Sequence, residues 1–168
     1  MKRYRSAEWN FSLDVPKGWH SFPPVATNSP LEVIRFASKE DGTHLVIIFR
    51  GPRDPQRSLK EVSDQAEQKL VRQDFRNFVT TETTIGSRPA LLLEFDRPWA
   101  IGSLTRWQRR WRRICPFKKP LSGGTWSCRE YFLAEGSLQY TLGFGTTNKD
   151  GMFELFDRMA KSFEFRAD

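Results

Sequence analysis

The chain has 168 residues, of which 38% are hydrophobic and 14% aromatic, and its formal net charge is +7. This length suits one domain, and 14 Phe with 6 Trp supply enough apolar surface for a core, which excludes a disordered chain. The longest apolar run, Leu45–Phe49, is far shorter than the roughly 20 residues that a membrane-spanning helix needs. Since no signal peptide is evident either, we expect a soluble protein, with the cytoplasm slightly favoured.

The first third of the chain predicts a strand and a hairpin. Residues 11–15 alternate apolar and polar side chains, the period-two pattern of a half-buried strand, and a Pro-Lys-Gly-Trp turn follows at 16–19. The apolar runs Leu31–Ala37 and His44–Arg50 are joined by six polar residues, which is typical of a hairpin.

Next comes the strongest helix signal in the sequence. Ser58 followed by Glu61 forms a capping box, in which hydroxyl and carboxylate satisfy free amides at a helix start. Apolar residues then recur at helical spacing, and two phenylalanines extend or flank the same face: Leu59, Val62, Ala66, Leu70, Phe75 and Phe78.

The second half predicts two further hairpins, a helix and a closing strand. The hairpins comprise 80–85 with 90–95 and 131–134 with 138–144, each around a glycine-containing turn. A helix is predicted from Asp150 onward, followed by a short strand at 162–165. Because hairpins dominate, we expect a single α+β domain with an antiparallel β-sheet flanked by helices, rather than a parallel fold.

Three local signatures give the chain a resemblance to the PsbP-like fold family, which is named for an extrinsic protein of photosystem II and includes a Ran-binding nuclear import factor. They are the opening segment 11–19 (FSLDVPKGW), the late hairpin 129–142, and the C-terminal Lys161-Ser162-Phe163-Glu164-Phe165. The resemblance implies an antiparallel sheet between helices and a docking or assembly role, with no catalytic residues to carry over. Since a fold does not fix a function, it implies no specific partner.

The positive charge is local. Residues 97–127 contain eight Lys and Arg and no Asp or Glu, whereas the rest of the chain has 19 basic and 20 acidic residues. The same segment holds four of the six tryptophans. We therefore predict a basic Trp/Arg-rich insertion at 97–127 within the single domain 1–168.

The centre of this insertion supplies the candidate partner-binding residues: Trp107, Arg109, Arg110, Trp111, Arg112 and Arg113. As a helix it would be basic and amphipathic, suited to an anionic membrane surface. As an extended strip it would interleave indole and guanidinium groups, suited to single-stranded nucleic acid. Trp and Arg are also enriched at protein interface hot spots. We favour an acidic protein partner over a membrane, and a membrane over nucleic acid; the bland alternative is that the tryptophans pack on the sheet and the arginines are solvated.

Nothing in the sequence indicates catalysis, a metal or a cofactor. His20 and His44 are the only histidines and Cys115 and Cys128 the only cysteines, and their spacing does not fit a zinc site. The two cysteines are equally compatible with a disulfide and with reduced thiols. A small-molecule-binding or hydrolytic domain is the alternative class, and it would require a pocket between sheet and helix that holds a histidine beside a carboxylate. The oligomeric state stays open.

Overall fold

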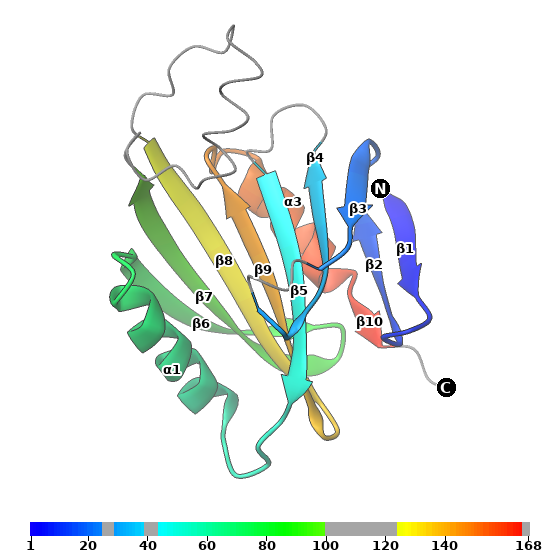
Figure 1. The fold of residues 1–168 in the computed structure, drawn as a ribbon, viewed down its shortest axis with the longest axis horizontal. Helices are drawn as coiled ribbons and strands as arrows, with labels where there is room; N and C mark the ends of the chain where they lie inside the picture. Colours follow the sequence, from blue (N-terminus) through cyan, green and yellow to red (C-terminus); the bar gives the residue numbers. More distant parts are fainter. Residues whose placement is uncertain (25–28, 39–43, 100–123, 166–168) are drawn as a thin grey trace, which may run out of the picture.

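The computed structural model describes residues 1–24, 29–38, 44–99 and 124–165 (Figure 1). Its strands are β1 (Lys2–Ser6), β2 (Phe11–Val15), β3 (Trp19–Phe22), β4 (Glu32–Ser38), β5 (His44–Pro52), β6 (Arg76–Ile85), β7 (Arg88–Trp99), β8 (Gly124–Glu135), β9 (Leu138–Thr146) and β10 (Glu164–Phe165). Its helices are α1 (Leu59–Val71) and α3 (Met152–Lys161). The described strands form a seven-stranded sheet, β3-β4-β5-β9-β8-β7-β6, and a three-stranded sheet, β1-β2-β10. Every pairing between them is antiparallel, which confirms the predicted α+β class.

Helix α1 begins where the capping box predicts. The Ser58 side chain accepts a hydrogen bond from the Glu61 N–H, and the Glu61 carboxylate accepts one from the Ser58 N–H. The predicted apolar face of α1, together with Phe75 and Phe78, packs on one face of the sheet, against Leu91, Leu93, Phe95 and Phe132.

Helix α3 covers the opposite face of the large sheet (Figure 1). Alternate residues of a strand point to opposite faces, so Leu91 and Leu93 face α1 while Ala90 belongs to the other core. Phe156, Met159 and Ala160 of α3 are fully buried in this second core, which is the larger one. Strand β10 then pairs with β2, so the described C-terminal residues close the small sheet against its N-terminal strands.

The three predicted hairpins are confirmed, and all of their strands except β4 are longer than predicted. Between β6 and β7 only Gly86 and Ser87 form the turn, and Gly86 has φ +60°, a left-handed conformation that favours glycine. Strand β7 ends at Trp99 and strand β8 begins at Gly124. Residues 97–99 and 124–127 of the predicted insertion are therefore strand residues. Two strands, β1 and β3, were not predicted from the sequence.

Candidate functional site

The six candidate partner-binding residues, 107 and 109–113, lie outside the described residues. The strands that flank them are described. Trp99, the last residue of β7, is paired with Gly124, the first residue of β8. Trp99 and Gly124 therefore lie side by side at one end of the large sheet.

A polar cluster lies in the sheet next to these two points. The Asp96 carboxylate accepts a hydrogen bond from the Asn77 amide, 3.2 Å from its Oδ2. Its other oxygen, Oδ1, lies 3.0 Å from the Lys149 Nζ. A bulge in β6 between Arg76 and Val79, with Asn77 at φ +59°, accompanies the bond from Asn77. Burial by itself would raise the pKa of Asp96, but bonds from Ser127, Lys149 and Asn77 outweigh it, and the pKa is lowered.

Arg129 forms a second polar cluster between the sheet and α3. Its guanidinium donates to the Glu94 carboxylate at 2.9 Å, to the Phe153 carbonyl at 3.2 Å and to Asp157. The Tyr131 hydroxyl also donates to Asp157, and burial and this contact together raise the pKa of Tyr131. Arg129 lies 4.0 Å from the centre of the Phe153 ring. These groups satisfy one another, so we assign the cluster to fixing α3 on the sheet.

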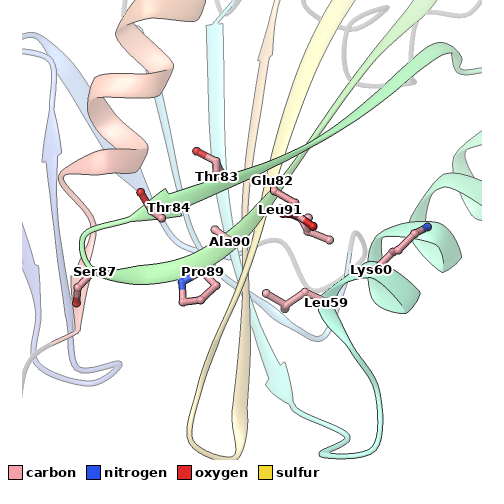
Figure 2. A pocket seen from close by; sticks show the side chains of 9 residues that line it. All are labelled: Leu59, Lys60, Glu82, Thr83, Thr84, Ser87, Pro89, Ala90 and Leu91. Atoms are coloured by element: carbon pink, nitrogen blue, oxygen red, sulfur yellow. The ribbon is translucent and has the colours of Figure 1, made fainter.

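In the described part of the chain, two of the hollows adjoin the sheet. A small one of about 240 Å³ lies beside Asp96 and Lys149, with Phe153 of α3 in its lining. A larger groove of about 560 Å³ lies between the start of α1 and the β6–β7 hairpin (Figure 2). Neither hollow is lined by a histidine. The histidine–carboxylate pocket that would have indicated hydrolysis is thus found in neither of these two hollows.

The two histidines lie outside both hollows, and Cys128 is the one cysteine among the described residues. His44 Nδ1 lies 2.9 Å from the Thr146 hydroxyl, and its ring is stacked parallel to Trp19. His20 is in β3, opposite Ala37. Cys128 is a free thiol whose pKa burial raises to about 12. Within the described ranges, no group of three His, Cys, Asp or Glu side chains could hold a metal ion.

One unusual carboxylate, Glu130 of β8, was not predicted from the sequence as a site residue. It shares the α1 side of the sheet with Phe132, and one of its oxygens is 3.9 Å from the point where a Cβ on Gly143 would stand. Burial raises its pKa to about 7. The sequence does contain a sign of this, because Glu130 interrupts the apolar alternation of a strand. Adjacent Arg129 and Glu130 nevertheless resemble a solvated pair at the surface, which is the usual place for such residues.

No helix in the described part of the chain is both long and apolar enough to span a bilayer.

Neither the protein-family models nor the curated proteins contain a match to this chain. Solved structures do match it. The solution structure of PsbP (CyanoP) from Synechocystis sp. PCC 6803 has a TM-score of 0.67 and 12% identity, covering 98% of this chain and 91% of that one. LpqN of Mycobacterium tuberculosis, involved in cell envelope biogenesis, has a TM-score of 0.63 and 10% identity, covering 99% and 90%.

The Ran-binding protein Mog1p of Saccharomyces cerevisiae also matches, with a TM-score of 0.60 and 10% identity, covering 98% of this chain and 94% of that one. At such identities the similarity shows the fold alone. It confirms, for the fold, the resemblance predicted from residues 11–19, 129–142 and 161–165: the chain has the fold shared by PsbP and Mog1.

Proposed function

We propose that this chain is a non-enzymatic docking module that binds an acidic protein partner through the basic segment, which we define as residues 100–123. The proposed contact residues are Trp107, Arg109, Arg110, Trp111, Arg112 and Arg113. One observation carries the proposal: residues 100–123 have seven basic and no acidic side chains, while the rest of the chain has 20 basic and 20 acidic residues. Such a concentration steers an acidic surface toward one place on the molecule.

Two further observations support a protein partner. The ends of the basic segment start from paired residues of a rigid sheet, so both are held at one place before a partner binds. Among proteins of the same fold, Mog1p is Ran-binding, so this fold is compatible with binding a protein. The guanidinium groups would pair with carboxylates, and the indole rings would supply apolar contact area.

The test is affinity capture from a lysate of the native host with three baits. The first is the intact protein and the second carries Arg109→Glu with Arg112→Glu. The third carries Lys17→Glu with Lys161→Glu, which makes the same change in net charge at exposed residues of the described surface. We expect the intact protein and the lysine variant to retain one acidic protein that the arginine variant loses.

Matched binding assays separate the other partner classes. Vesicles of phosphatidylserine with phosphatidylcholine and a single-stranded DNA oligomer are titrated with the same three proteins. Loss of vesicle or DNA binding in the arginine variant, with unchanged capture of proteins, would assign the segment to that ligand instead. Equal capture by all three baits would show that the segment is not the docking surface.

A further inference from the structure

Strand β6 forms a long free edge of the large sheet. It is the last strand of the order, and among the described residues it pairs only with β7. After the bulge its pairing is regular from Val79 to Ile85. Val79 is 54% exposed, and the neighbouring threonines are mostly exposed as well. An edge of this kind presents unpaired N–H and C=O groups to any extended chain.

The other described edges are protected in the usual ways. Strand β3 at the far side of the large sheet has only four residues, and β10 has two. Strand β1 carries Lys2, Arg3 and Arg5, and charged side chains discourage edge pairing. The regular part of β6 has no Lys, Arg or Pro and is rich in threonine, which favours strands. Glu82 is the one charged side chain in this part of β6, so this edge is less protected than the others.

The register identifies which backbone groups of β6 face outward. Thr84 lies opposite Pro89, which has no N–H, so this is the non-hydrogen-bonded kind of antiparallel pair. The two kinds alternate along a ladder. The backbone groups of Thr80, Glu82 and Thr84 consequently point away from β7.

The large groove lies beside these outward groups (Figure 2). Leu59 at the start of α1 extends toward Pro89 and, with Leu91, gives the groove an apolar lining. Glu82 lies opposite Leu91 and so shares the α1 face. It forms no salt bridge within the described structure, whereas Lys60 at the same groove is paired with Asp64 at 3.0 Å.

We propose that the β6 edge binds an extended segment of a partner protein as an additional strand. The segment places aliphatic side chains over the groove and a basic side chain opposite Glu82. The backbone groups of Thr80, Glu82 and Thr84 supply the ladder, and side chains that lie opposite them share their face, toward α1. The basic side chain of the segment forms the salt bridge that Glu82 does not form within the described structure.

A second copy of this chain fits the edge less well. Antiparallel self-pairing centred on Glu82 would set two carboxylates opposite each other, and a centre at Thr81 would set Thr80 opposite Glu82. Only a centre at Val79 brings Arg76 opposite Glu82, and that register carries the β6 bulge into the ladder. The occupant with the required chemistry is therefore a different chain.

This proposal does not rest on the proposed function. The groove adjoins the start of β7 at Pro89, while the basic segment follows its end at Trp99. Ten residues of strand separate these positions by about 33 Å. Each surface can thus be altered without changing the other.

The test uses the intact protein and a defined peptide, Ser-Leu-Thr-Lys-Thr-Leu-Ser, acetylated and amidated at its ends. Its sequence is symmetric, so it presents the same side chains in either strand direction. In an NMR titration we expect the largest amide shifts at Thr80, Glu82 and Thr84, with slower hydrogen exchange at these three amides. Absence of binding at peptide concentrations up to about 5 mM would overturn the proposal, because even a very weak complex would be detected there. Shifts that map to another surface would also overturn it.

Two variants make the register specific. Glu82→Lys should lower the affinity for the lysine peptide about three- to tenfold. It should raise the affinity for a peptide that has Glu in place of Lys by a similar factor. Thr80→Pro removes one outward N–H and should abolish binding while the melting temperature stays near that of the intact protein. A charge exchange without effect would contradict the pairing opposite Glu82. Concentration-dependent dimers without peptide, lost in Thr80→Pro, would assign the edge to a second copy instead.

Discussion

Trp99 and Gly124 lie directly opposite each other across β7 and β8. The segment between them, 100–123, holds all six proposed contact residues, so the most basic part of the chain is attached to the sheet through one pair of neighbouring strands. Long segments joined to a rigid scaffold at one place are typical positions for binding residues. This pair connects the sheet to the proposed binding segment.

Arg129 should be among the most important polar residues for stability. Its side chain is only 13% exposed and contacts Glu94 and Asp157. In Arg129→Met both carboxylates lose their cation, and we expect the free energy of unfolding to fall by about 3 kcal/mol. For a domain of this size the melting temperature should fall by roughly 6–12 °C.

Lys60→Ala is the control for Arg129, because its pair with Asp64 is an exposed one. It should change the free energy of unfolding by less than about 1 kcal/mol. Urea unfolding of both variants measures the difference. Equal stabilities would show that the Arg129 cluster contributes no more than a surface ion pair.

Glu130 should make stability decrease as the pH rises. Burial raises its pKa from 4.5 to about 7, so between these values the folded protein holds a proton that the unfolded chain releases. The contribution of this group to stability is therefore present at pH 4.5 and is lost as the pH approaches 7 and above.

The Glu130→Gln variant stays neutral throughout and should lack this decrease. At pH 8 it should be more stable than the intact protein by up to about 3 kcal/mol, and at pH 4.5 the two should be similar. Urea unfolding at both pH values measures this. Parallel stability curves for the two proteins would contradict the raised pKa.

Cys128 should be unreactive while the protein is folded. Burial raises the pKa of its thiol to about 12, so little reactive thiolate exists at pH 8. In a Cys115→Ser variant, which leaves one cysteine, iodoacetamide should label the native protein far more slowly than the protein in urea. Rapid labelling without denaturant would show that the Cys128 site opens readily.

Local sequence patterns predicted most of the fold. The capping box at Ser58 and the alternation in Phe11–Val15 are each contained within a few residues, so the sequence displays them directly. Strand β1 escaped because its Lys and Arg residues hide the alternation. It pairs with the neighbouring β2, and its Arg3 also donates to the distant Ser162 carbonyl at 2.8 Å. No local pattern reports such a contact.

The polar clusters could not be predicted for the same reason. Arg129 meets Glu94 and Asp157, which lie 35 and 28 residues away in the sequence. Only the register of β7 with β8 and the placement of α3 bring them together. The basic segment is the reverse case, because its charge is visible in the sequence alone.

Binding of the partner by the basic segment is tested most directly by replacing that segment. Residues 101–122 are exchanged for a Gly-Ser linker of about five residues, which suffices because Trp99 and Gly124 are paired neighbours. Circular dichroism and a thermal melt first establish that the sheet persists. Isothermal titration then compares the intact and replaced proteins with the captured acidic protein. We predict heat of binding for the intact protein and none for the replaced one; equal affinity for both would contradict the account.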